Sequence, residues 1–109
     1  NGDHHGAIAD YSSAVWCDPS LAIAFFYRGL SYQKIGNATA ALTDYNEAIR
    51  LSPDAAIAYY HRAAISQKLG DRTTAMSDFE QASQLFEARG SHGNAQRAKA
   101  SLEKLRATA

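Results

Sequence analysis

The sequence contains a single cysteine and only two prolines, and it has no surplus of charge of either sign. Its 11 Lys and Arg balance 11 Asp and Glu, which removes the main electrostatic driver of nucleic-acid binding. Cys17 can form neither an internal disulfide nor a Cys/His zinc cluster, so we expect a small buried apolar residue in a reducing compartment. No apolar run approaches the roughly 18 residues of a membrane span, and no secretory signal is visible. We therefore expect a cytoplasmic protein that neither inserts into membranes nor binds nucleic acid.

The sequence also lacks the residue clusters that catalysis and metal binding require. His4 and His5 are adjacent, so on a helix their side chains would point about 100° apart. Asp44 and Glu47 are three residues apart, but no second pair faces them, and we expect His92 to be exposed in a loop. No glycine-rich phosphate loop, GxSxG or HExxH occurs. We predict no catalytic residue, metal site or cofactor, and we do not expect an enzyme.

A period of 34 residues organises the chain, because Gly2, Gly36 and Gly70 recur at this interval. Residues 22–55 match residues 56–89 at 12 of 34 positions without a gap. The same interval links Ala7, Ala41 and Ala75; Asp10, Asp44 and Asp78; the rings of Tyr11, Tyr45 and Phe79; and Ala14, Ala48 and Ala82. The chain is therefore built from internal repeats.

Each repeat is predicted to be a pair of antiparallel helices, because small and apolar residues recur at spacings of three and four. Gly36-Asn37 and Gly70-Asp71, like Gly2-Asp3, read as a glycine that ends one helix followed by an N-cap. Asp18-Pro19 and Ser52-Pro53 read as a capping side chain before a proline at the first helical position. We expect helices at about 3–17, 19–35, 38–51, 53–69, 72–89 and 94–107.

These residues resemble the tetratricopeptide repeat (TPR) family, whose signature is an aromatic-x-x-Leu-Gly-x-x-Tyr helix, then Ala-x-x-x-aromatic, then proline. One full repeat matches through Phe25, Gly29, Tyr32, Ala41, Tyr45, Ala48 and Pro53. The resemblance implies an all-α, right-handed superhelical solenoid of antiparallel helix pairs. We divide this single domain 1–109 into the second helix of a partial repeat (1–21), two repeats (22–55 and 56–89) and a capping helix (90–109).

Two departures from the family pattern carry further predictions. Arg28 and Arg62 occupy the family's leucine position, and we expect them to pair with aspartates of a neighbouring helix, with independent solvated charges as the alternative. Glu87 replaces the family's proline, so the helix from residue 72 should continue to about Gly90.

The repeat pattern stops after Gly90. Residues 94–107 place Ala95, Ala98, Leu102 and Leu105 on one stripe, with polar residues elsewhere. This arrangement resembles the polar-faced helix that caps many TPR arrays. An amphipathic membrane-surface helix is the weaker alternative, because the stripe has only two large residues.

The resemblance implies a non-enzymatic scaffold that binds a peptide or helix of a partner protein in a concave, largely aromatic and apolar groove. Helical RNA readers with 35-residue repeats are disfavoured by the 34-residue period and the zero net charge. The family's clamp of Lys, Asn and Arg for chaperone C-termini is absent from the two complete repeats. The groove residues carried over are Ile23, Phe26, Tyr27, Leu30, Gln33 and Lys34, and Ile57, Tyr60, His61, Ala64, Gln67 and Lys68.

The first expected helix, at 3–17, offers a different function. The resemblance makes it the second helix of a pair whose first helix is missing, which leaves an apolar side uncovered. The sequence is then part of a longer bacterial-type array, or a second copy covers this side. The alternative function is therefore self-association as a homodimer through Ile8, Tyr11, Val15 and Trp16.

Overall fold

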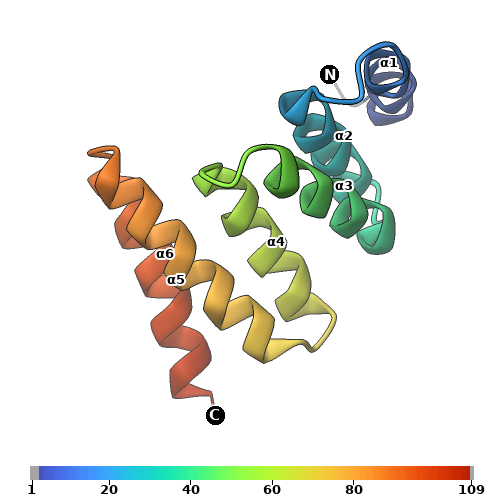
Figure 1. The fold of residues 1–109 in the computed structure, drawn as a ribbon. Helices are drawn as coiled ribbons and strands as arrows, with labels where there is room; N and C mark the ends of the chain where they lie inside the picture. The colour runs from blue at the N-terminus through green and yellow to red at the C-terminus, as the bar shows by residue number, and fades with distance from the viewer. Residues whose placement is uncertain (1–2, 109) are drawn as a thin grey trace. The chain divides into compact units, whose positions relative to one another are not determined.

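The computed structural model describes residues 3–108, and these residues form six α-helices and no strand (Figure 1). The helices are α1 (His4–Cys17), α2 (Ala22–Lys34), α3 (Ala38–Leu51), α4 (Ala56–Lys68), α5 (Arg72–Ala88) and α6 (His92–Ala107). The expected all-α repeat fold is confirmed. Backbone contacts divide the chain into two compact units, Asn1–Pro53 and Asp54–Ala109, called unit 1 and unit 2 below.

The glycine signals end helices as predicted. Gly36 and Gly70 have φ of 85° and 83°, a left-handed conformation that costs glycine no steric clash. After α2, the N–H groups of Gly36 and Asn37 donate to Gln33 and Tyr32 carbonyls, which is the Schellman pattern. Asn37 Oδ1 then accepts the Ala40 N–H at 3.1 Å and so caps α3. The same device joins α4 to α5, whereas Gly2 lies outside the described residues.

The predicted helix starts at the two prolines are wrong. Helix α2 begins three residues after Pro19 and α4 three residues after Pro53, and Asp18 and Ser52 are C-caps of the preceding helices. The residue before a proline is driven out of the helical region, so both helices end there. Asp18 Oδ1 accepts from the Ser20 backbone N–H and hydroxyl at 3.0 and 2.6 Å, which stabilises a turn instead of a cap.

The junction between α5 and α6 confirms one prediction and corrects another. Helix α5 runs unbroken through Glu87 and ends before Gly90, which has a φ of 76°. The last helix begins at His92, so this residue lies in a first helical turn and not in the expected loop. Its side chain is exposed, as expected, and its Nδ1 lies 2.5 Å from a Glu87 carboxylate oxygen.

In unit 1, helix α2 packs against both α1 and α3. The close approach of α2 to α3 depends on Gly29, because a Cβ at this position would lie 3.0 Å from the Tyr45 ring and 3.2 Å from Asp44 Cβ. On the other side of α2, the rings of Tyr11 and Tyr27 stack with centroids 5.8 Å apart. Small and large side chains thus alternate between the helices.

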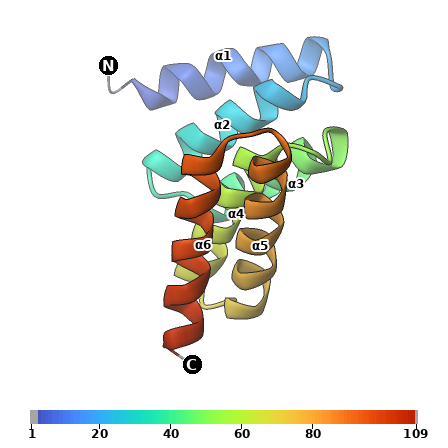
Figure 2. The ribbon, with the colours of Figure 1, turned by 90° about the vertical axis from the view of Figure 1, so that its left-hand side faces the viewer.

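In unit 2, α5 packs between α4 and α6, and the three helices run antiparallel in chain order (Figure 2). Helix α6 buries the predicted stripe of Ala95, Ala98, Leu102 and Leu105. The alanines pack with Phe86 and the leucines with Phe79. The remaining surface of α6 is largely polar and exposed, as expected for a capping helix.

Helix α1 differs from the other five because none of its described residues is buried. Cys17, expected to be buried, is exposed and free. Among residues 3–108, the helix that Cys17 ends packs closely against α2 alone, and no other described helix covers this position. No helix in the described part of the chain is long and apolar enough to span a membrane.

Candidate partner-binding surfaces

An arginine pairs with an aspartate within each complete repeat and holds its two helices in register. Arg28 of α2 donates from Nε and Nη2 to both carboxylate oxygens of Asp44 in α3, each at 2.8 Å. Its Nη1 donates to Ser12 Oγ of α1 at 3.2 Å, and its guanidinium lies 5.4 Å from the centre of the Phe25 ring. Hydrogen bonding to Asp44 raises the pKa of Arg28 above its ordinary value, although burial opposes this shift. The predicted interhelical pair is confirmed.

The second repeat reproduces this arrangement. Arg62 of α4 donates to both carboxylate oxygens of Asp78 in α5 at 2.7 and 2.9 Å and lies over the ring of Tyr59. Asp78, like Asp44, is almost completely buried. The guanidinium groups of both arginines and the carboxylates of both aspartates bind each other between the helices. They are therefore not available to bind a ligand.

The predicted residues of α2 divide by exposure. Ile23, Tyr27 and Lys34 are exposed, and Ile23 and Tyr27 lie four residues apart on one side of the helix. Phe26, Leu30 and Gln33 are half-buried, and Gln33 accepts a hydrogen bond from the Tyr45 hydroxyl at 2.7 Å. The α2 surface, defined by Ile23 and Tyr27, therefore offers exposed apolar area.

In α4, Ile57, Gln67 and Lys68 are exposed, whereas Tyr60, His61 and Ala64 are half-buried. The Tyr60 ring packs edge-on against His61 and against Phe79, with centroids 5.9 and 5.4 Å apart. Tyr60 is thus held in place by the core of unit 2, which fixes the orientation of the face that it presents.

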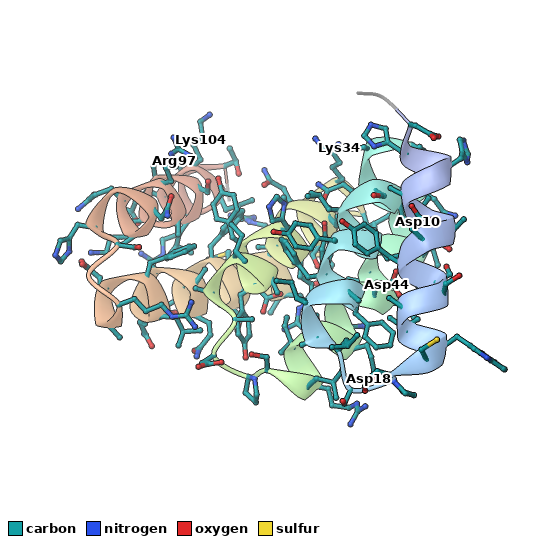
Figure 3. The ribbon with its side chains drawn as sticks, turned by 90° about the horizontal axis from the view of Figure 1, so that it is seen from above. Asp10, Asp18, Lys34, Asp44, Arg97 and Lys104 are labelled. Atoms are coloured by element: carbon teal, nitrogen blue, oxygen red, sulfur yellow. The ribbon has the colours of Figure 1, made fainter. Side chains whose placement is uncertain are left out.

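The structure adds a pocket that brings two of these residues together with three others. The pocket has a volume of about 40 Å³ and is lined by Ile57, Tyr60, Phe86, Asn94 and Arg97, all in unit 2. We call it the α4–α6 pocket. Phe86 is buried, whereas Asn94 and Arg97 are exposed residues of α6, where Figure 3 shows Arg97. Apolar rings from α4 and α5 therefore meet polar donors from α6.

Sequence reasoning identified Ile57 and Tyr60 but missed the other three residues. The repeat pattern assigns Phe86 to no site and puts Arg97 among the polar residues of the predicted capping helix. A signal was nevertheless present, because Asn94 follows Tyr60 by the repeat interval of 34 residues, as Tyr60 follows Phe26. Extending the period beyond Gly90 would have aligned Asn94 with these aromatic positions.

The residues predicted for self-association lie on α1. Trp16 is 87% exposed, whereas Ile8, Tyr11 and Val15 are half-buried. Among residues 3–108, no three His, Cys, Asp or Glu side chains gather where they could hold a metal ion.

Comparison with protein families gives two matches. Residues 35–70 match a family described as TPR repeat, and residues 56–89 match one described as tetratricopeptide repeat. Together the matches cover residues 35–89, about half of the chain. A search of curated protein sequences gives no significant match.

Solved structures of helical-repeat proteins are similar over nearly the whole chain. PcrH in complex with the chaperone binding region of PopD has a TM-score of 0.94 and 28% identity, covering 98% of this chain and 81% of that one. The first TPR of Spaghetti (RPAP3) bound to the HSP90 peptide SRMEEVD has a TM-score of 0.75 and 26% identity, covering 91% and 82%. The Yersinia enterocolitica type III secretion translocator chaperone SycD, in an alternative dimer, has a TM-score of 0.91 and 18% identity, covering 98% and 82%.

Proposed function

Because this chain belongs to the tetratricopeptide repeat family, we propose that it is a non-enzymatic scaffold that binds a segment of a partner protein. The α4–α6 pocket is the observation that carries this proposal. Similar structures support it, since PcrH and RPAP3 are each solved with a segment or peptide of another protein. The further groove residues of α2 and α4 contribute exposed apolar contacts in this proposal.

The size of the pocket favours a protein side chain over a small molecule. Small-molecule sites usually enclose roughly 300–1,000 Å³, whereas this pocket encloses about 40 Å³. The rings of Tyr60 and Phe86 provide an apolar wall for a single leucine, methionine or aromatic anchor. Burying one such side chain contributes about 1.5–3 kcal/mol, which makes it the main energetic contact of a short segment.

The polar lining of the pocket indicates what flanks this anchor. Arg97 forms no ion pair within the described residues, whereas each of the other arginines binds a carboxylate or a carbonyl oxygen. The Asn94 amide can donate to and accept from a peptide backbone. We therefore propose a segment with an apolar anchor and a neighbouring Asp or Glu.

A peptide array with matched charge reversals tests this proposal. The chain is applied to peptides of varied sequence, and we expect selection of an apolar anchor next to an acidic residue. Arg97→Glu should abolish the acidic preference, and Ile57→Asp should weaken binding generally. Lys104→Glu is the control, because it makes the same change of charge on the same helix but outside the pocket (Figure 3). Equal binding by the Arg97→Glu and Lys104→Glu variants would contradict the proposed site.

Self-association is the second candidate, favoured by the 87% exposure of Trp16. A homodimer would cover this ring together with Ile8, Tyr11 and Val15. Light scattering over a concentration series should then show a dimer that Trp16→Ala dissociates. We also propose a cytoplasmic location, because the given sequence offers Cys17 no second cysteine with which to form a disulfide.

A further inference from the structure

The α4–α6 pocket is lined by a ring that the first complete repeat lacks. Phe86 and Glu87 follow Ser52 and Pro53 by the repeat interval of 34 residues. Helix α3 ends before Pro53, with Ser52 as its C-cap, whereas α5 continues through both positions to Ala88. Since proline no longer stops the helix there, residue 86 lies on a helical face and its ring enters the core of unit 2.

The Phe86 ring is tightly held by its surroundings. Phe86 is only 6% exposed and packs in one cluster with Ala56, Ala82, Ala95 and Ala98, all of which are fully buried. An alanine methyl group cannot turn aside to make room, so these neighbours leave the ring little freedom to move. The inner surface of the pocket therefore has a fixed position.

The second ring of the lining is fixed as well. The Tyr60 ring packs edge-on against the buried Phe79, with centroids 5.4 Å apart and an angle of 70° between the ring planes. Ile57 also lines the pocket but is 42% exposed, so it lies where the pocket opens to solvent. Neither ring can withdraw easily to enlarge the space between them.

The space that these residues leave is small. The pocket has about 40 Å³, whereas an apolar cavity of about 150 Å³ holds a benzene ring. The ring of a Phe, Tyr or Trp side chain therefore cannot enter the pocket fully. The end of an aliphatic side chain is narrower and can enter.

Building on the binding function proposed above, we propose that Phe86 sets the size of the anchor in the α4–α6 pocket and restricts it to an aliphatic side chain. The end of a leucine side chain inserts against Phe86 and Tyr60, and the neighbouring Asp or Glu of the bound segment meets Arg97. An aromatic anchor lies across the entrance and forfeits its contacts with the inner surface. An apolar pocket distinguishes side chains that differ by one methylene by about tenfold or more.

Peptides with a varied anchor test this role of Phe86. The peptide that binds best in the array is resynthesised with Val, Leu, Phe or Trp at its anchor position, and fluorescence anisotropy measures the affinity of each for the complete chain. The unchanged chain should bind the Leu peptide about tenfold more tightly than the Phe peptide. Phe86→Leu enlarges the pocket and should remove this preference.

Two further variants separate pocket size from a general loosening of the core. Ile57→Ala widens the entrance at an exposed residue and should lower the ratio of Leu-peptide to Phe-peptide affinity while the chain stays folded. Leu102→Val is the control, because it shortens a buried side chain of α6 that does not line the pocket and should leave this ratio unchanged. Circular dichroism of each variant verifies that its helices are formed.

Two results would overturn the role of Phe86 and leave the proposed function standing, provided that Arg97→Glu still abolishes the acidic preference. These are equal binding of the Leu and Phe peptides by the unchanged chain, and equal ratios in the Phe86→Leu and Leu102→Val chains. If Phe86→Leu does not fold, an unchanged ratio in the Ile57→Ala chain overturns this role. An array that selects no peptide would overturn both the proposed function and the role of Phe86.

Discussion

Arg28 and Asp44 form a bidentate ion pair in which the aspartate side chain is only 3% exposed. A carboxylate so deeply buried is stable only with a partner, because removing a charge from water costs several kcal/mol. The arginine retains 19% exposure, so one end of the pair reaches solvent. The pair thus helps to specify which face of α3 meets α2, because rotating α3 would break both hydrogen bonds between Arg28 and Asp44.

Replacing Arg28 by the family's leucine should destabilise the protein by roughly 3 kcal/mol or more, because it leaves the Asp44 charge buried and unpaired. Adding Asp44→Ala to this variant should restore part of the loss. Urea unfolding measures both changes. Arg50→Leu is the matched control, because it breaks the exposed Arg50–Glu47 pair and should cost less than about 1 kcal/mol. Equal costs for Arg28→Leu and Arg50→Leu would show that the interhelical pair is only a surface contact.

Gly70 should resist substitution for a backbone reason. Its φ is 83°, and a Cβ there would meet nothing within 4 Å, so only the left-handed conformation opposes a side chain. Gly70→Ala should lower the free energy of unfolding by about 1–2 kcal/mol. Gly93→Ala, at an equally open position inside α6, should raise it by about 0.4–1 kcal/mol. Thermal unfolding of both variants tests this difference. The prediction is wrong if both alanines raise, or both lower, the free energy of unfolding.

The repeat architecture could be predicted because its signals are local and recur. Gly36-Asn37 and Gly70-Asp71 each combine a left-handed glycine with a capping side chain, and both parts act within a few residues. Asp18-Pro19 was misleading because an aspartate before proline can cap a helix or close a turn. In the structure the Asp18 carboxylate accepts a hydrogen bond from Ser20 and so closes a turn. Whether this aspartate caps a helix or closes a turn depends on where α1 ends.

The site was harder to predict because it depends on packing between helices. Arg97 has no sequence feature that separates it from the other cations of α6, yet it is the one that lines the pocket with Tyr60 and Phe86. The exposure of Cys17 likewise depends on a neighbour and not on its own helix.

Gly29 should tolerate alanine but not a branched side chain. A Cβ there would lie 3.0 and 3.2 Å from Tyr45 and Asp44, so the ring must shift by a few tenths of an ångström. The other repeat already has Ala63 at this position, which indicates that such a shift is accessible. Gly29→Ala should remain within about 1 kcal/mol of the unchanged protein, whereas Gly29→Val should cost about 1–3 kcal/mol by overpacking. Urea unfolding measures both, and Gly93→Val controls for the lower helix propensity of valine. If the two valine variants are equally stable, the close contact has no energetic role.

Glu87 links α5 to α6 and should make the stability of unit 2 depend on pH. Its carboxylate accepts a hydrogen bond from Lys99 Nζ at 2.9 Å and lies 2.5 Å from His92 Nδ1. The bonds from Lys99 and His92 lower the pKa of Glu87 below its ordinary value of 4.5. A carboxyl group with a lowered pKa in the folded state contributes stability above its unfolded pKa and loses it as the pH falls.

Glu87→Gln should therefore reduce the free energy of unfolding at pH 7 and have little effect well below pH 4, where Glu87 itself is protonated. Because the pair is partly exposed, the loss should be small and should shrink further in high salt. Urea unfolding of the two proteins across this pH range gives the difference directly. Glu80→Gln is the control on the same helix, because this carboxylate forms no ion pair within residues 3–108. A constant difference between the Glu87→Gln and unchanged proteins from pH 7 to pH 3 would show that the amide disturbs packing and that the carboxylate charge does not hold α6 in place.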